Sequence, residues 1–299
     1  MSVLVVGSIA LDSIETPHGN AEDSLGGSAL YFSAAASFFS PVNVVGVVGK
    51  DFDFSQVDFL KKRRVDFEGL VAEEGKTFRW GGRYRENMNK RDTLFTHLNV
   101  FQNFAPVIPA RYRKDELIFL ANIAPELQLE VLEQIDKPRL SVLDTMNFWI
   151  SGAREPLVRL IEKVDVLILN DEELRELTGL RNMFESARGL LKSGPRAVVI
   201  KKGEHGAVLV TQDGYFLAPA YPVSRVVDPT GAGDSFAGGF LGYLSTCKTI
   251  DHQNLRRAVA YGAVAASFTV EDFSFNRLKN ITLRDIEARV ELLRQMTAF

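Results

Sequence analysis

The stretch DPTGAGD at residues 228–234, which runs into a helical pattern over 234–244, decides how this sequence is interpreted. Gly231, Ala232 and Gly233 leave the backbone amides uncovered, because none has a side chain larger than a methyl group. The first turn of a helix adds unpaired amides and a positive dipole end, so the turn can hold an anion without a cationic side chain. Asp234 stands at the same point and can accept the proton of an attacking hydroxyl, as in-line phosphoryl transfer requires. We predict an anion hole with Asp234 as general base, and an ordinary capped helix start is the alternative.

Around this stretch, short branched apolar runs alternate with helical patterns over most of the 299 residues. Continuous apolar runs of this kind are typical of buried parallel strands. Their alternation with helices predicts an α/β fold, with helices on both faces of a mostly parallel sheet. The predicted strands are 3–6, 44–48, 117–120, 142–143, 166–169, 198–200 and 208–210, and the predicted helices are 28–39, 126–135, 155–164, 172–178, 185–192, 234–244, 254–268 and 283–296.

Two stretches, residues 12–25 and 77–101, break this rhythm. The second mixes aromatic and cationic side chains and then alternates at Thr93, Phe95 and His97. Alternation of period two indicates half-buried strands, so both stretches are predicted to form a small separate sheet. The predicted domain organisation is a main domain of residues 1–11, 26–75 and 105–299, and a small β domain of residues 12–25 and 76–104.

The composition narrows the classes of function. A formal net charge of −3 at pH 7 gives no field that would hold a polyanion, so neither nucleic acid nor a membrane surface is expected as a partner. Cys247 is the only cysteine, which excludes an internal disulfide and favours a reducing compartment. No apolar run approaches the about 20 residues of a membrane span, and the N-terminus lacks the pattern of a secretory leader. We therefore predict a cytoplasmic protein.

The 228–234 stretch resembles the signature of the ribokinase-like (PfkB) family of sugar and nucleoside kinases. The resemblance extends over nearly the whole chain, although only this stretch is specific by itself. It implies a three-layer α/β/α sandwich in which the small β domain is a lid that excludes water. It also implies ATP and Mg²⁺ as cofactors, a sugar or ribonucleoside as acceptor, and a homodimer formed through the lid.

The metal ligands come from the same resemblance. The segment beginning at Asn170 is similar to the family's Asn-x-x-Glu, which implies that Asn170 approaches the ATP phosphates and that Glu173 orders Mg²⁺ through water. Alone, the segment would be an acidic helix start. Asp228 and Thr230 match two backbone ligands of the family's K⁺ site. The stretch 267–276 lacks the usual glycine, so the resemblance does not decide whether this chain has a K⁺ site.

The nucleotide loop is expected after the strand at 198–200. Lys201 begins a segment similar to the family's loop, in which Gly203 and Gly206 let the backbone approach ATP. Taken alone, this segment would be a hairpin turn. Residues 258–262 lack the Asn that meets adenine in many relatives, so an apolar contact with the base is expected there.

The acceptor side is expected near the N-terminus. Asp12 follows the first strand, and Gly26 and Gly27 open the first long helix, at the spacing where the family holds sugar hydroxyls on the Asp carboxylate. A carboxylate can accept two hydroxyl hydrogen bonds. Tyr31 stands where the family commonly has an acceptor-binding Asn, which weakens direct hydroxyl recognition at that position.

Two further residues are assigned to the acceptor. Asn147 belongs to a segment similar to the family's Asp-Pro-Asn, at the carboxyl end of a strand, where α/β sheets bind ligands. Trp80 could stack on the apolar face of a sugar or on a nucleobase, and the aromatic residues do not decide between the two. Tyr84, Phe148 and Trp149 share that property.

Two alternatives remain open. Cationic side chains in the predicted lid raise the possibility of an acceptor that already carries a phosphate, although a solvated lid rim is the favoured explanation for them. A non-catalytic sugar- or nucleoside-binding protein on the same fold is the other alternative, which the retained Asp234 and its glycines argue against. The lid cations are Arg79, Arg83, Arg85, Lys90 and Arg91.

Overall fold

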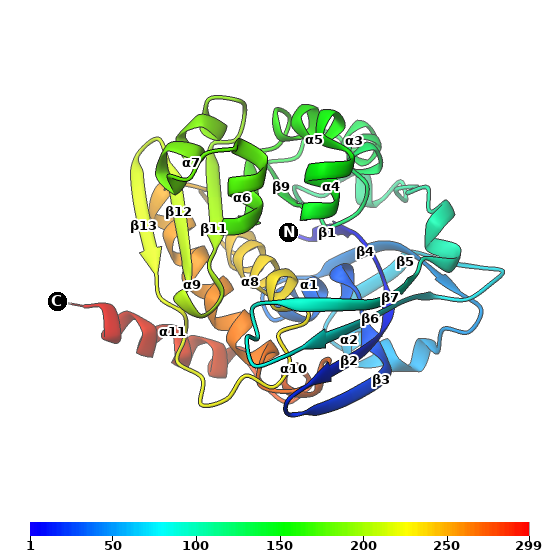
Figure 1. Ribbon diagram of the computed structural model, residues 1–299. Coiled ribbons are helices and arrows are strands. Elements are labelled where there is room, and N and C mark those ends of the chain that lie inside the picture. Colours follow the sequence, from blue (N-terminus) through cyan, green and yellow to red (C-terminus); the bar gives the residue numbers. More distant parts are fainter. Residues whose placement is uncertain (299) are drawn as a thin grey trace.

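The computed structural model describes residues 1–298, and a nine-stranded sheet forms its centre (Figure 1). The strands are β1 (Val3–Val6), β4 (Val42–Gly49), β5 (Val65–Glu73), β8 (Leu117–Leu120), β9 (Leu140–Asp144), β10 (Val166–Asn170), β11 (Ala197–Lys201), β12 (Ala207–Thr211) and β13 (Gly214–Ala218). Their order is β13-β12-β11-β10-β9-β8-β1-β4-β5. Every pairing from β11 to β5 is parallel, whereas β12 pairs antiparallel with both neighbours. The predicted mostly parallel sheet is confirmed.

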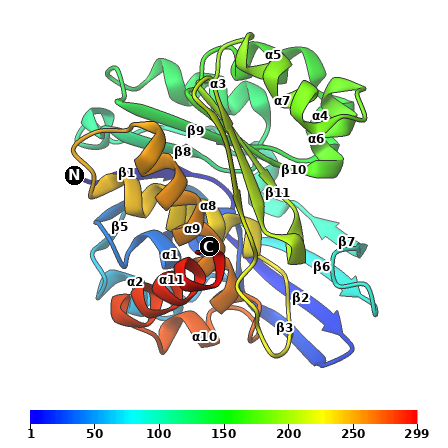
Figure 2. The same ribbon diagram turned by 90° about the vertical axis from the view of Figure 1, so that its left-hand side faces the viewer.

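Helices cover both faces of this sheet (Figure 2). One layer holds α1 (Ser28–Ala36), α2 (Asp58–Lys61), α8 (Ala232–Ser245), α9 (His252–Thr269), α10 (Asn276–Lys279) and α11 (Leu283–Thr297). The other holds α3 (Pro125–Glu133), α4 (Asn147–Gly152), α5 (Arg154–Ile161), α6 (Asp171–Thr178) and α7 (Met183–Leu191). Successive side chains of a strand point to opposite faces, so Val3 and Val5 join one hydrophobic core while Leu4 and Val6 join the other. The three-layer sandwich is confirmed.

A second sheet of four strands projects from the main body (Figures 1 and 2). It consists of β2 (Ala10–Thr16), β3 (Gly19–Gly26), β6 (Phe78–Tyr84) and β7 (Arg91–His97), in the order β3-β2-β6-β7. β2 and β6 are parallel, and the two outer pairings are antiparallel. The small separate sheet predicted from the two irregular stretches is therefore present, and we call it the lid.

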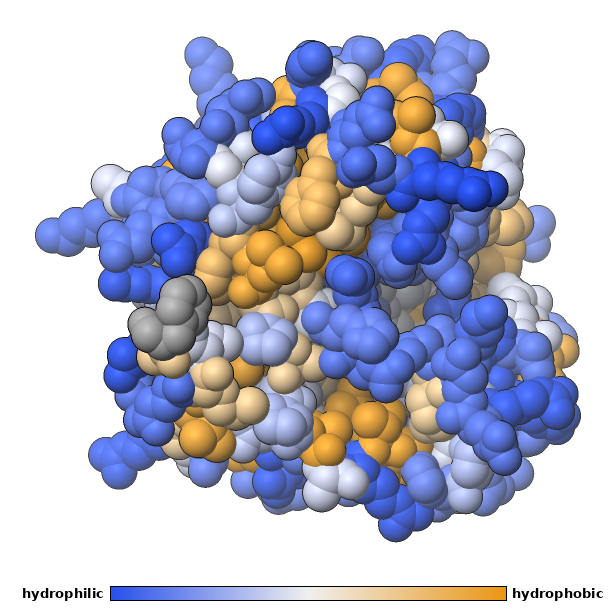
Figure 3. Space-filling model, turned by 60° about the vertical axis from the view of Figure 1, so that its left-hand side comes forward, coloured by the Kyte–Doolittle hydropathy of each residue, from blue (hydrophilic) through white to orange (hydrophobic). Residues whose placement is uncertain are grey.

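The edge strands β5 and β13 and the short helix α4 were not predicted. Edge strands are half-exposed, and β5 accordingly carries Asp66 and Glu68 between apolar residues, whereas β13 is a short apolar segment, GYFLA, whose residues alternate in exposure. Leu217 on β13 is 63% exposed, and Figure 3, which brings this side forward, shows a band of apolar side chains on an otherwise hydrophilic face. Short 3-10 turns occur at Phe54–Val57, Asn99–Asn103, Tyr112–Lys114 and Gly203–His205. Within residues 1–298, none of the helices has the length and apolar character to cross a bilayer.

Candidate active site

The glycine-rich turn leads directly into α8. Gly231 has a φ of 74°, a left-handed conformation that favours glycine, and a Cβ at this position would lie 2.3 Å from the ring of Tyr31. No side chain caps the start of α8, and the amide of Ala232 donates to the carbonyl of Pro229 at 3.2 Å. The first turn of a 14-residue helix thus presents amides and a positive dipole end beside residues 231–233.

Asp234 lies in the first turn of α8 and is partly buried. Burial is the main cause that raises the pKa of Asp234 to about 7, and the charge of Asp144 raises it further. Lys201 and Arg91 act in the opposite direction because they stabilise the ionised carboxylate. A carboxylate with a pKa near neutrality is well matched to accepting a proton from a hydroxyl group.

Lys201 joins the nucleotide loop to Asp144. Its Nζ donates to Asp144 Oδ1 at 3.0 Å, from the carboxyl end of β11 to that of β9. The same ammonium lies 3.0 Å from where a Cβ on Gly233 would be. Burial lowers the pKa of Lys201, but Asp144, Glu173 and Asp234 together raise it, so the side chain stays a cation beside the glycine-rich turn.

Asn170 and Glu173 form a capping box at the start of α6. Asn170 Oδ1 accepts from the amide of Glu173 at 2.8 Å, and Glu173 Oε2 accepts from the amide of Asn170 at 2.7 Å. Glu173 is 6% exposed, and burial raises its pKa to about 7, with Lys201 lowering it and Asp144 raising it. The helix-start interpretation is therefore correct, and it leaves Glu173 Oε1 without a capping role.

The nucleotide loop turns sharply at two glycines. Gly203 has a φ of 53° and Gly206 a φ of 87°. A Cβ on Gly206 would lie 2.0 Å from the carbonyl oxygen of Ala218, so only glycine fits this turn between β11 and β12. Lys202 donates its amide to the carbonyl of Gly206 at 2.8 Å, which closes the loop.

Asp12 is the buried carboxyl of the lid. It is 5% exposed, and burial, together with the charges of Asp228 and Asp234, raises its pKa to about 8. A Cβ on Gly26 would lie 1.9 Å from Asp12 Oδ2, and one on Gly27 would lie 2.5 Å from the carbonyl of Ser8. Both glycines are therefore required for Asp12 to sit beside the start of α1.

The other predicted acceptor residues lie in different surroundings. Trp80 on β6 is the register partner of Asp12 on β2, so the two side chains share one face of the lid. Tyr31 is 2% exposed and stacks on Phe275 at 4.5 Å between ring centroids. Asn147 is exposed and donates to Glu176 Oε2 at 2.5 Å, which ties it to α6.

The lid reaches the main domain at two points near its tip. Thr230 Oγ1 donates to the hydroxyl oxygen of Tyr84 at 3.2 Å, which connects the glycine-rich turn to β6. Asn89 Nδ2 donates to Glu204 Oε1 at 3.4 Å, and Asn89 Oδ1 lies 2.4 Å from where a Cβ on Gly203 would be. The connection between β6 and β7 thus lies against the loop between β11 and β12, and the tip of the lid contacts the main domain.

The arrangement was compared with known proteins. The sequence profile described as pfkB family carbohydrate kinase matches residues 2–278. The chain belongs to this family. It is 30% identical over 247 residues to a cytidine kinase of Thermococcus kodakarensis, covering 81% of this chain and 87% of that protein.

Solved structures agree with the fold. The crystal structure of the Methanocaldococcus jannaschii nucleoside kinase, described as an archaeal member of the ribokinase family, superposes with a TM-score of 0.78 at 23% identity, over 97% of this chain and 98% of that one. A putative ribokinase II from E. coli in complex with ATP and Mg²⁺ gives a TM-score of 0.79 at 18% identity, over 97% and 99%. The predicted resemblance to the PfkB family is confirmed, and so is the prediction of a carbohydrate or nucleoside kinase.

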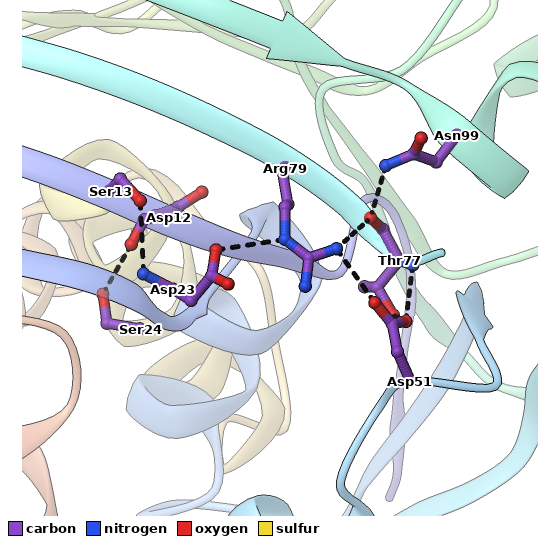
Figure 4. Close-up of polar contacts among 8 residues, drawn as sticks. All are labelled: Asp12, Ser13, Asp23, Ser24, Asp51, Thr77, Arg79 and Asn99. Atoms are coloured by element: carbon purple, nitrogen blue, oxygen red, sulfur yellow. Dashed lines mark hydrogen bonds and ion pairs between the residues drawn. The ribbon is translucent and has the colours of Figure 1, made fainter. Parts of the chain in front are cut away.

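In this PfkB kinase, most of the lid arginines pair with acidic residues, and Figure 4 shows the pairing of Arg79 with Asp23 and Asp51. Arg79 donates to Asp23 Oδ1 at 3.0 Å and to Asp51 Oδ2 at 2.9 Å, and Asp51 also accepts from the amide and hydroxyl of Thr77. This network fixes the base of the lid to the loop after β4. The further pairs are Arg83 with Glu15 and Arg85 with Asp92.

The fit of K⁺ to this PfkB kinase rests on Asp228, which is 1% exposed. Its Oδ1 accepts from the amide of Thr230 at 2.9 Å, and the amide of Ser274 also lowers its pKa, although burial raises it overall. The carbonyl of Val270 accepts from the amides of both Val227 and Asp228. These contacts brace the turn through the side chain and amide of Asp228, and they do not involve the backbone carbonyls of Asp228 and Thr230 that match the family's K⁺ ligands, so the K⁺ site stays a prediction.

Proposed function

We propose that this PfkB kinase transfers the γ-phosphoryl group of ATP to a hydroxyl of a nucleoside or an unphosphorylated sugar, with Asp234 as general base. The observation that carries the proposal is the meeting of the uncapped start of α8 with a carboxyl whose pKa is about 7. The hydroxyl oxygen attacks the γ-phosphorus, the bond to the bridging oxygen breaks, and ADP leaves. Asp234 takes the hydroxyl proton, while Gly231, Ala232 and Gly233 surround the transferring group.

The nucleotide side is proposed from the loops around Lys201. Gly203 and Gly206 open the backbone of the loop to ATP, and Lys201 gives a cation beside Gly233. Asn170 and Thr230 lie at the same carboxyl edge of the sheet and would contact the phosphates. Mg²⁺ neutralises phosphate charge when bound, and Glu173 Oε1 would hold it through water. K⁺ at the backbone carbonyls of Asp228 and Thr230 stays a prediction.

The acceptor side is proposed from the lid. Asp12 would accept hydrogen bonds from two hydroxyls, and Trp80 beside it would stack on the ring of the acceptor. Further contacts with the acceptor would come from Tyr31, which lies beneath Gly231, and from Asn147 at the start of α4. Of these four residues, Asp12 is the best supported, since Gly26 and Gly27 make room for its side chain.

An unphosphorylated acceptor is favoured over a sugar phosphate. Unpaired cations suit a phosphate best, and three of the five lid cations, Arg79, Arg83 and Arg85, are each held by carboxylates. The cytidine and nucleoside kinases among its relatives favour a nucleoside in particular. The lid-mediated homodimer and the cytoplasmic location stay predictions.

The test is a panel of ribonucleosides, free sugars and sugar phosphates, each assayed for ADP release with ATP and Mg²⁺. We expect a ribonucleoside or free sugar to give the highest kcat/KM, with the phosphorylated product identified by mass. Preferred turnover of a sugar phosphate would refute the acceptor assignment. ATP binding without transfer to any member would favour the non-catalytic alternative.

A further inference from the structure

One lid arginine differs from the others in its position on the sheet. Arg91 on β7 is the register partner of Tyr84 on β6, so both side chains lie on the face that carries Trp80 and Asp12. Arg79 and Arg83 occupy the alternate positions of β6 and point to the opposite face. We call this face of the lid, which carries Asp12, Trp80, Tyr84 and Arg91, the cleft face.

The guanidinium of Arg91 has no carboxylate of its own. Among residues 1–298, no ion pair within 4.0 Å involves it, whereas the other arginines of the lid sheet and its tip each have one. Its Cζ lies 5.5 Å from the ring centroid of Trp80, within the range of a cation–π contact. Its charge nevertheless reaches the centre, since it lowers the pKa of both Asp234 and Glu173.

Two contacts bracket Arg91 along the lid. On one side, Asn89 lies against Gly203 and Glu204 of the nucleotide loop. On the other, Tyr84 is 7% exposed and bonded to Thr230 of the glycine-rich turn. Both loops are the proposed phosphate-binding elements, so the lid carries Arg91 to the point where they meet.

We propose that Arg91 is a catalytic residue supplied by the lid, whose guanidinium binds the phosphoryl group in transfer. The inference rests on the proposed function. During transfer the three outer oxygens of the phosphoryl group carry its negative charge, and a planar guanidinium can donate two parallel hydrogen bonds to them. Lys201 and the start of α8 approach this group from the main domain, and Arg91 approaches it from the lid. Closure of the lid thereby couples acceptor binding at Asp12 and Trp80 to charge stabilisation.

The test compares Arg91→Gln with Arg85→Gln in the full chain, on the best acceptor of the panel. Arg85 is 72% exposed at its side chain and paired with Asp92, so it is a matched lid arginine outside the centre. We expect Arg91→Gln to lower kcat by about 10²–10³, the range for losing one preorganised donor to a developing anion, and to change the acceptor KM far less. Arg85→Gln should keep wild-type kinetics, and added guanidinium ion should restore part of the activity of Arg91→Gln.

Two outcomes would overturn the inference. A kcat of Arg91→Gln within a few-fold of wild type would remove Arg91 from the transfer step, and so would a raised acceptor KM at unchanged kcat, which would make Arg91 an acceptor-binding residue through Trp80. If Arg91→Gln melts at a lower temperature, Arg91→Lys decides, since it keeps the charge but not the fork, and full activity there would contradict the bidentate contact. Wild-type transfer separates the two proposals, because its absence would refute the proposed function instead.

Discussion

Both faces of the lid carry arginine and acidic side chains, but among the described residues these side chains form ion pairs on one face and not on the other. On one face, Arg79 and Arg83 pair with Asp23, Asp51 and Glu15. On the cleft face, Asp12 and Arg91 are left without ion-pair partners, among the ion pairs of the described residues, although Trp80 lies close to both.

This difference separates stability from function. Paired charges on a surface satisfy each other and hold the base of the lid, whereas unpaired charges in a cleft cost stability unless a ligand satisfies them. The raised pKa values of Asp12, Asp234 and Glu173 report that cost. Variants of the cleft face should therefore change kinetics, and variants of the opposite face should change only stability.

The largest expected effect is that of Asp234→Asn. The amide keeps the size of the side chain but cannot accept the hydroxyl proton, so kcat should fall by about 10²–10⁴, while ATP binding and the melting temperature are retained. In the wild type, kcat/KM should fall below pH about 7, because the raised pKa of Asp234 leaves the base protonated there. The measurements are steady-state kinetics from pH 5 to 9 and nucleotide binding by calorimetry.

A kcat of Asp234→Asn near that of the wild type would contradict the assignment of Asp234 as general base. A matched variant, Glu172→Gln, removes an exposed carboxylate from the first turn of α6. Its kinetics should equal those of the wild type, which would exclude a general effect of net charge.

Asp12→Asn should have the next largest effect. Hydrogen bonds to a charged group contribute about 1.5–3 kcal/mol, so at pH 9, above the Asp12 pKa of about 8, the acceptor KM should rise by about 10–10², with a much smaller change in the KM for ATP. The pKa of Asp12 is about 8 in the folded protein and near 4 when unfolded, so the folded state loses stability as pH rises between these values. Urea unfolding at pH 5 and pH 8 should show a smaller loss for the variant.

Equal rises in both KM values would instead assign Asp12 to the architecture of the cleft. Asp23→Asn, on the opposite face, is the matched control. It should leave both KM values unchanged.

Local features of the fold and site were predictable. β1 and β8 were predicted with their observed bounds, because each residue in them is buried between two helix layers. The glycine-rich turn and the place of Asp234 at the start of α8 were also predictable, because a helix start and the turn before it are adjacent in sequence. The half-exposed edge β5 gives no such signal, because Asp66 and Glu68 interrupt its apolar residues, whereas the short apolar segment of β13 was missed.

Features that depend on register were not predictable. Tyr84 and Thr230 are 146 residues apart, and their contact exists only because β6 pairs in parallel with β2. From the sequence, Asn147 was predicted to bind the acceptor and no role was predicted for Asp144, although the ion pair of Asp144 with Lys201 places Asp144 in the candidate active site. Its position at the end of a buried strand was the available signal. The cleft-facing position of Arg91 likewise depends on the bulge between Gly81 and Gly82, which shifts the pairing of β7.

The smallest effect is expected from Arg79→Met, which keeps the length of the side chain and removes its charge. Arg79 is 21% exposed and its partners are more exposed, so water weakens both ion pairs and the loss of stability should be about 1 kcal/mol. Because Thr77 still holds Asp51, the base of the lid stays attached and kcat should not change. Urea unfolding and steady-state kinetics on one preparation measure both quantities. A fall in kcat comparable to that of Arg91→Gln would show that the paired face also takes part in transfer, and the division between the two faces would be lost.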